Sequence, residues 1–147
     1  HDARFCAVGA ELEAGRVGNP EVVAWSEDTE VDAIQNMDIG AMPLPDTPWA
    51  RGKCGYKLIQ YMACGLPVVA SPVGVNKEIV EHGVNGFLAE SDEEWRTAIE
   101  ALISDPDLRH RMGAAGRKKV ENDYSLQVWG PRVANMLRSV ANKGTST

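Results

Sequence analysis

The sequence predicts an α/β fold: a Rossmann-like, doubly wound and mostly parallel sheet of about five strands, with helices on both faces and a helical C-terminal end. Two patterns lead to this prediction. Short apolar runs alternate with segments whose apolar residues recur at helical spacing, and glycine or proline stands at most junctions between them. Strands separated by helical crossovers pair in parallel and are covered on both faces. The 147 residues fit one domain, which we place at residues 1–140, with a frayed tail at residues 141–147.

The first half of the chain holds three of the expected strands, at residues 4–10, 21–25 and 38–44. A short helix is expected between the second and third strands, at residues 30–37, with Thr29 as its N-cap. The segment "PLPDTPW" follows, and its prolines can continue neither a helix nor a strand. We therefore expect a loop at this point.

The second half begins with a helix at residues 55–65, "GYKLIQYMACG", which its last glycine ends. The next elements, in order, are a strand at residues 67–71, a short helix at residues 76–83 and a strand at residues 85–90. Three helices complete the chain, and the first opens on a capping box formed by Ser91 and Glu94. The second runs over residues 106–120. The third carries an apolar stripe that is expected to enter a core or to contact another domain, and its members are Trp129, Val133, Met136, Leu137 and Val140.

The composition narrows the class of protein. A net charge of −6 argues against broad binding to nucleic acid, and no apolar run approaches the about 18 residues of a membrane-spanning helix. Three cysteines without metal-ligand spacing favour free thiols and a reducing compartment, so we expect a cytoplasmic protein. The three histidines have no acidic or cysteine partner at metal-ligand spacing. We therefore expect no metal ion, no cofactor and no nucleic-acid partner.

Basic residues gather where a loop is expected to lead into the helix at residues 55–65. Arg51, Lys53 and Lys57 lie close together in an otherwise acidic chain, beside two glycines. Ligands of parallel α/β sheets bind beyond the carboxyl ends of the strands, and a helix N-terminus attracts phosphate. Spacing alone leaves two interpretations open, a phosphate site and an ordinary solvated face.

Residues 55–91 carry a longer pattern, "GYKLIQYMACGLPVVASPVGVNKEIVEHGVNGFLAES". This segment resembles the nucleotide-sugar-binding segment of the glycosyltransferases of family 4. In that family a phrase like Met-Ala-x-Gly-x-Pro-Val-Val-Ala-Ser is followed by Gly-x-x-x-Glu-Ile-Val-x-x-Gly-x-x-Gly-Phe. The resemblance extends from about residue 21 to residue 124. It implies the C-terminal domain of a two-domain GT-B enzyme, truncated at its N-terminal end because the chain begins one strand late.

The resemblance also implies roles for individual residues. Lys57 and Lys53 are the catalytic candidates, since they would stabilise the leaving diphosphate. Gln60 is the expected ribose contact, and Gly55 is the glycine that lets the ligand approach the backbone. Gly52 and Gln60 stand where family members usually carry two glutamates, the first touching the donor sugar and the second the ribose.

Three further binding candidates are Trp25, Ser71 and Gly74. Trp25 either flanks the nucleobase or packs at a strand end. Ser71 and Gly74 follow the strand at residues 67–71, and their turn either faces the ligand with its backbone amides or merely requires glycine.

The function that the resemblance implies is that of the donor-binding half of a retaining glycosyltransferase, of the hexosyltransferase type. Its partners would be a nucleoside diphosphate sugar and an acceptor-binding N-terminal domain. Because the family reacts in the cleft between two domains, the isolated chain is expected to be inactive. Peripheral membrane association of the full-length protein is compatible with the resemblance. Two alternatives remain open: a non-catalytic interaction module of the same fold, and a sugar-nucleotide epimerase of GT-B architecture.

Overall fold

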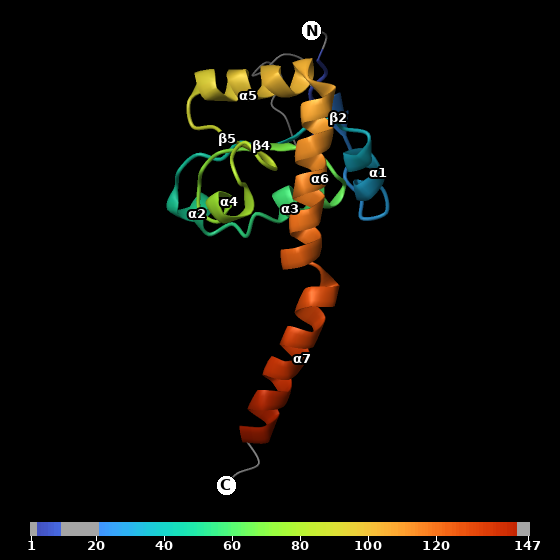
Figure 1. The fold of residues 1–147 in the computed structure, drawn as a ribbon, viewed down its shortest axis with the longest axis vertical. Helices are drawn as coiled ribbons and strands as arrows, with labels where there is room; N and C mark the ends of the chain where they lie inside the picture. The colour runs from blue at the N-terminus through green and yellow to red at the C-terminus, as the bar shows by residue number, and fades with distance from the viewer. Residues whose placement is uncertain (1–2, 10–20, 144–147) are drawn as a thin grey trace.

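A computed structural model of the chain describes residues 3–9 and 21–143, and its elements confirm the α/β class. In order they are β1 (Cys6–Val8), β2 (Glu21–Val23), α1 (Glu30–Gln35), β3 (Gly40–Met42), α2 (Pro48–Arg51), α3 (Tyr56–Ala63), β4 (Val68–Ala70), α4 (Asn76–Ile79), β5 (Gly86–Leu88), α5 (Asp92–Ser104), α6 (Pro106–Asp123) and α7 (Leu126–Lys143). Figure 1 shows the strands and short helices gathered beside α6, with α7 leading away from them.

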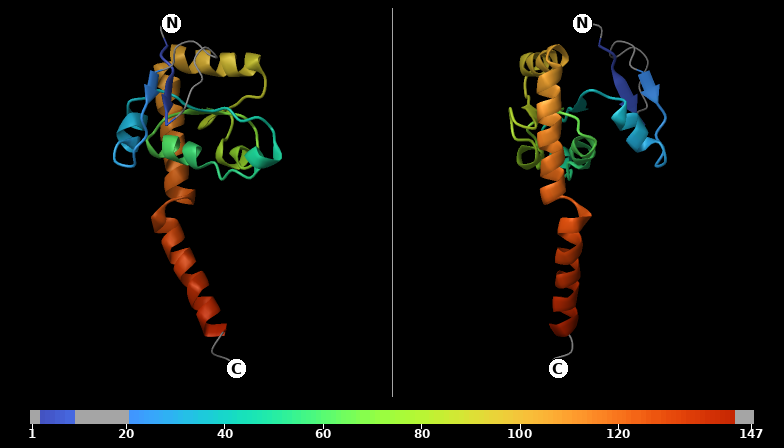
Figure 2. Two further views of the ribbon diagram at one scale, coloured as in Figure 1. Left: turned by 180° about the vertical axis from the view of Figure 1, so that it is seen from behind. Right: turned by 45° about the vertical axis from the view of Figure 1, so that its right-hand side comes forward.

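The five strands pair in parallel, and they are divided between two sheets. β1 pairs with β2 in one sheet, and the other sheet has the order β3-β4-β5. Every residue of β4 is buried, whereas β1 and β2 are exposed or half-buried. The right-hand view of Figure 2 shows the first pair standing to one side of the body. The single sheet that we expected is therefore split into two, and only the three-stranded sheet lies in the core.

β4 is the centre of the core, and its alternating side chains face two apolar clusters. One cluster contains Leu58, Met62, Val68, Ala70, Ile79, Val80 and Val120. The other contains Val69, Ala89, Ala98, Leu102 and Met112. α3 and α4 contribute to the first cluster, α5 to the second and α6 to both, so helices cover both faces of this sheet.

α6 crosses α3 closely because two glycines of α6 have no side chain. A Cβ on Gly113 would lie 1.9 Å from the carbonyl oxygen of Gly65, and a Cβ on Gly116 would lie 2.9 Å from Cγ of Met62. Both distances are shorter than van der Waals contact. The two glycines thus allow α3, which carries several candidate site residues, to pack directly on α6.

The segment expected to be a loop after β3 contains a short helix, α2. Thr47 caps it, since Oγ1 of Thr47 accepts a hydrogen bond from the backbone N–H of Ala50 at 3.2 Å. Pro48 takes the first helical position, where the missing N–H would have no helical partner. Pro48 therefore starts a helix inside the segment expected to be a loop, which the sequence interpretation missed.

Two other details differ from expectation. Thr29 precedes α1, but its side chain makes no capping hydrogen bond. α4 ends at Ile79, earlier than expected, because Val80 adopts an extended conformation and His82 pairs with Gly86 beside β5. The Ser91–Glu94 capping box at the start of α5 is present as expected.

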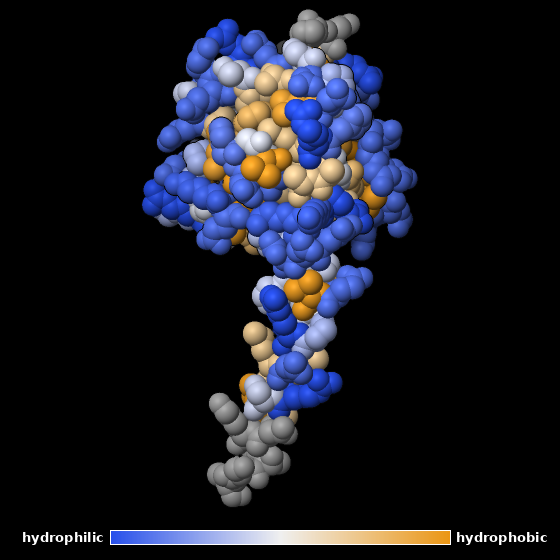
Figure 3. All heavy atoms as spheres, in the orientation of Figure 1, coloured by the Kyte–Doolittle hydropathy of each residue, from blue (hydrophilic) through white to orange (hydrophobic). Residues whose placement is uncertain are grey.

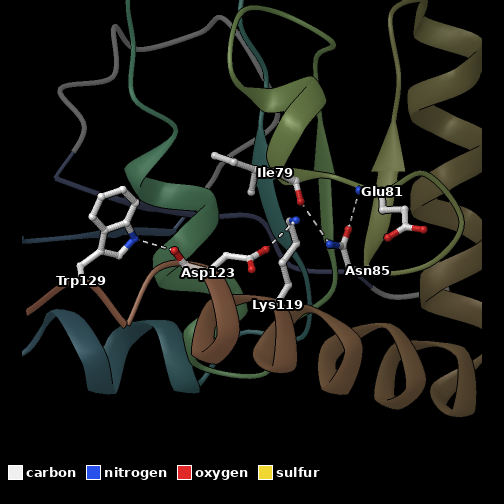
Figure 4. Close-up of polar contacts among 6 residues, drawn as sticks. All are labelled: Ile79, Glu81, Asn85, Lys119, Asp123 and Trp129. Carbon is white, nitrogen blue, oxygen red and sulfur yellow. Dashed lines mark hydrogen bonds and ion pairs between the residues drawn. The ribbon is translucent and has the colours of Figure 1, made fainter. Parts of the chain in front are cut away.

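The turn between α4 and β5 is held by the side chain of Asn85, which is 2% exposed. Its Oδ1 accepts a hydrogen bond from the backbone N–H of Glu81 (2.9 Å), and its Nδ2 donates to the carbonyl oxygen of Ile79 (3.1 Å; Figure 4). One buried amide thus pairs both a donor and an acceptor of a tight turn.

α7 extends away from the body (Figure 1). Its start is tied to α6, because the indole N–H of Trp129 donates to the carbonyl oxygen of Asp123 at 2.6 Å (Figure 4). Figure 3 shows apolar surface along this helix, and the exposed residues are Leu126, Trp129, Val133, Met136, Leu137 and Val140. The expected stripe is present but does not enter the core of the described residues. No helix within those residues combines the length and the apolarity needed to cross a membrane.

Candidate functional site

The loop from α2 to α3 follows β3 and contains two of the candidate glycines. Gly52 is the exposed C-cap of α2, with an ordinary φ of −80°. Gly55 is buried at the start of α3 with φ +69°, and a Cβ there would lie 2.3 Å from Cδ1 of Ile79. The close approach at Gly55 is therefore made by α4. Within the described chain, nothing accepts a hydrogen bond from the backbone amides of residues 54–57.

The cations of this loop are compensated to different degrees. Arg51 donates twice to Asp46, from Nε to Oδ1 (2.6 Å) and from Nη2 to Oδ2 (2.9 Å), and these bonds lower the pKa of Asp46. Lys53 lies on the ring of Trp49, with Nζ 4.2 Å from the ring centroid. No carboxylate among the described residues pairs with Lys53. Its charge is thus the least compensated of the three.

Lys57, Gln60 and Trp25 meet on a carboxylate from α1. Nζ of Lys57 lies 2.5 Å from Oε1 of Glu30, and Nε1 of Trp25 donates to the same oxygen at 2.9 Å. Nε2 of Gln60 donates to Oε2 of Glu30 at 2.7 Å. These hydrogen bonds, that from Lys57 most of all, lower the pKa of Glu30 to about 2. Glu30 is therefore ionised at neutral pH.

Glu30 is the residue that sequence reasoning missed. The available signal was weak: Glu30 is an acidic residue at the start of a helix that follows a carboxyl-end loop. Such residues usually stabilise the helix N-terminus and do nothing more. Lys57 lies 27 residues and Gln60 lies 30 residues further along the chain, so spacing gave no reason to connect them.

The loop from β4 to α4 packs on the end of α2. Oγ of Ser71 accepts a hydrogen bond from the backbone N–H of Leu44 (2.9 Å), which joins the loops after β3 and β4. Nδ2 of Asn76, which is 1% exposed, donates to the carbonyl oxygen of Ser71 (3.0 Å). Gly74 has φ +54°, and a Cβ there would lie 2.7 Å from the carbonyl oxygen of Arg51. Gly74 is thus required by the turn and by its contact with α2.

The candidate residues fall into two groups, all on segments that follow β2, β3 or β4. Trp25, Lys57 and Gln60 are joined through Glu30. The other group surrounds the junction of the two loops, and it contains Gly52, Lys53, Gly55, Ser71 and Gly74. Among residues 3–9 and 21–143, no three side chains of His, Cys, Asp or Glu come together as metal ligands would.

Residues 13–119 match the model of the family described as glycosyl transferases group 1. The chain belongs to this family. The predicted resemblance to glycosyltransferases is confirmed at this level.

Two relatives of this group 1 chain are transferases by name. The GDP-mannose-dependent monoacylated alpha-(1-6)-phosphatidylinositol monomannoside mannosyltransferase of Corynebacterium glutamicum is 35% identical over 112 residues, which cover 74% of the group 1 chain and 29% of that protein. The capsular polysaccharide biosynthesis glycosyltransferase CapM of Staphylococcus aureus is 32% identical over 124 residues, covering 82% of the group 1 chain and 31% of CapM. The group 1 chain therefore spans less than a third of either relative.

Solved structures share the fold of the group 1 chain. HepE of Anabaena, whose crystal structure was solved with UDP and glucose, superposes with a TM-score of 0.71 at 24% identity, over 83% of this chain and 32% of HepE. The sucrose-phosphate synthase of Thermosynechococcus elongatus superposes with a TM-score of 0.68 at 20% identity, over 84% of this chain and 31% of that chain. At these identities the likeness establishes the fold alone.

Proposed function

We propose that this chain is the donor-binding half of a retaining glycosyltransferase of family 4 and of the hexosyltransferase type, within a full-length protein of GT-B architecture. The observation that carries the proposal is the gathering of candidate residues beyond the carboxyl ends of β2, β3 and β4. Parallel α/β sheets bind their ligands at that edge. Membership of the glycosyl transferases group 1 family supports a sugar donor as the ligand.

The proposed ligand is a nucleoside diphosphate sugar. The mannosyltransferase of C. glutamicum is named for its dependence on GDP-mannose, and HepE was solved with UDP and glucose. These names differ in base and in sugar, so the proposal stops at the class of donor. The acceptor, and any general base, would come from a second domain, and the isolated chain is expected to bind the donor without transferring its sugar.

Each part of the donor would meet a different group of residues. The diphosphate would lie at the start of α3, near Lys53 and Lys57, where cations and the positive end of the helix dipole stabilise the leaving group. Gln60 would contact the ribose, and Trp25 would flank the base. Gly52 has no side chain, so backbone groups or neighbouring residues would contact the sugar there. No metal ion or other cofactor is assigned a role, because the proposed leaving-group stabilisation comes from the protein.

A ligand titration tests the proposal. The full-length protein is mixed with UDP, GDP or ADP, and its melting temperature and binding heat are measured. We expect one nucleotide to stabilise the protein, and we expect Lys53→Ala to reduce that stabilisation. Lys118→Ala is the matched control, since Lys118 is an exposed lysine on α6 and is not one of the candidate site residues. Indifference to all three nucleotides would overturn the proposal.

The reaction is tested separately with the sugar nucleotide that binds. Transfer of the sugar to an acceptor with an unchanged anomeric configuration, followed by NMR, is the expected result for the full-length protein. Binding without transfer would favour the non-catalytic module, and conversion of the sugar nucleotide into an epimer would favour the epimerase. Inverted stereochemistry would contradict assignment to a retaining enzyme.

A further inference from the structure

One carboxylate holds three candidate residues of the donor site. Glu30 accepts hydrogen bonds from Lys57 (2.5 Å) and Trp25 (2.9 Å) at Oε1, and from Gln60 (2.7 Å) at Oε2. Its side chain is 14% exposed. Charge-assisted bonds from several directions fix the orientation of a carboxylate and of its partners. Because α1 follows β2 and α3 follows β3, Glu30 also ties the two sheets together at their carboxyl ends.

The pairing changes the charge that Lys57 can offer to a ligand. Glu30 and Lys57 form an ion pair, so together they contribute no net charge. If Lys57 moved to a diphosphate, the ionised Glu30 would be left facing another anion. Arg51 is likewise engaged by Asp46. Lys53, which rests on Trp49, is the cation of this loop that has no carboxylate partner within the described residues.

The acceptor groups of the cluster point to a different part of the donor. Oε2 of Glu30 accepts one hydrogen bond from the described residues and retains capacity for another. Oε1 of Gln60 is buried and has no hydrogen-bond partner within the same residues. The amide of Gln60 cannot be reversed, since its oxygen would then face the carboxylate. Acceptor oxygens match the hydroxyl groups of a nucleoside, which donate, and not phosphate oxygens, which only accept.

We propose that Glu30 is a positioning residue that reserves Lys57 and Gln60 for the nucleoside of the donor and leaves the diphosphate to Lys53. The inference rests on the proposed function, because it divides the donor site into a neutral nucleoside end and a charged diphosphate end. It also reverses the expected order of the two lysines as leaving-group contacts. Lys57 helps to bind the nucleoside as part of the neutral Glu30–Lys57 pair, and Lys53 stabilises the negative charge of the diphosphate.

A charge-balanced double substitution tests this division. In the full-length protein, Glu30→Gln combined with Lys57→Met removes one negative and one positive charge and so leaves the net charge unchanged. Binding of inorganic pyrophosphate and of whichever of UDP, GDP or ADP binds best is measured by calorimetry. We expect the double variant to bind pyrophosphate as the wild type does, and to bind the nucleoside diphosphate about tenfold more weakly.

Lys53→Met gives the opposite pattern. We expect it to lower the affinities for pyrophosphate and for the nucleoside diphosphate alike, by about tenfold, because it removes a cation that contacts the phosphates. It should also flatten the salt dependence of binding, which a purely structural loss would not do. Asp32→Asn combined with Lys118→Met is the matched control, since both residues are exposed. This control is expected to leave both affinities unchanged.

Glu30→Asp keeps the test decisive if the double variant does not fold. It preserves the charge of the pair but moves the carboxylate away from its partners. It should therefore lower the affinity for the nucleoside diphosphate and leave the affinity for pyrophosphate unchanged. The inference is overturned if the double variant, or Glu30→Asp, lowers the affinity for pyrophosphate as much as Lys53→Met does. If wild-type protein binds none of the three nucleotides, the proposed function itself fails and the inference falls with it.

Discussion

Gly55→Ala probes how the start of α3 is built. Gly55 combines a left-handed backbone, φ +69°, with close packing on α4. An added Cβ would lie 2.3 Å from Cδ1 of Ile79 and 3.2 Å from Cγ1 of Val75. The first distance cannot be accommodated without moving Ile79, which has no exposed surface. The substitution therefore carries two separate penalties.

The magnitudes follow from the geometry. A left-handed conformation costs a residue with a Cβ about 1–2 kcal/mol relative to glycine, and forcing extra volume into a packed core costs about 1–3 kcal/mol. We expect Gly55→Ala to lower the free energy of unfolding by about 2–5 kcal/mol, the sum of the two. Such a loss is a large fraction of the stability of a domain of this size.

Two other glycines separate the two penalties. Gly65 has φ +77° but no atom within 4 Å of an added Cβ, so Gly65→Ala should cost only the backbone term of about 1–2 kcal/mol. Gly52 has φ −80° and its nearest neighbour to an added Cβ is the carbonyl oxygen of Trp49 at 3.5 Å. Gly52→Ala should therefore change stability by less than about 0.5 kcal/mol.

Urea denaturation followed by circular dichroism measures all three variants. Gly52→Ala is expected to be the most stable variant, Gly65→Ala the next and Gly55→Ala the least stable. Ile79→Val removes the Cδ1 atom that the added Cβ at position 55 would strike, so the double variant Gly55→Ala with Ile79→Val should lose less than the sum of its single losses. If Gly55→Ala costs no more than Gly65→Ala, or if the two losses simply add, α3 does not pack on α4 as described.

Three further predictions concern stability. Asn85→Ala should lower the free energy of unfolding by about 1–3 kcal/mol, because it leaves the buried carbonyl of Ile79 unpaired and removes the acceptor of the part-buried N–H of Glu81. Asn36→Ala, which removes an exposed side-chain hydrogen bond, should cost about 0.5 kcal/mol or less, and equal losses in urea titrations would contradict this reasoning. Ser91→Ala should cost about 1 kcal/mol in thermal unfolding through loss of the α5 cap, and an unchanged melting temperature would count against the cap. The pKa of Glu30 is lowered from 4.5 to about 2, so its stabilising contribution is present above pH 4.5 and is lost as the pH falls towards 2; Glu30→Gln should flatten the acid-denaturation profile over that range, and a wild-type profile in this variant would refute the pairing.

Most elements could be predicted because they depend on local signals. The helix at α3 follows from its apolar spacing and from the glycines at its ends, and the capping box of Ser91 and Glu94 lies within four consecutive residues. The prolines after β3 were ambiguous, because a proline cannot continue a strand or a helix interior but suits the first position of a helix, which Pro48 occupies. The division into two sheets was not predictable, since strand pairing joins residues that lie far apart in the sequence.

The candidate site shows the same division. Lysines and glycines beside a helix start, followed by a family-like phrase, selected Lys53, Lys57 and Gln60 as candidates from the sequence, and their roles stay predictions. The structure then assigned a packing role to Gly55, whose neighbour is Ile79, and an ion-pair partner to Lys57.

The sequence by itself determined the α/β class, most of the elements and the glycosyltransferase family, because these depend on spacing between near neighbours in the chain. Only the tertiary structure decided which charges cancel. Glu30 and Lys57 are separated by 27 residues and meet at 2.5 Å, and electrostatic interactions depend on distance in space, not on separation along the chain. For that reason two lysines that look equivalent in the sequence acquire different surroundings in the fold.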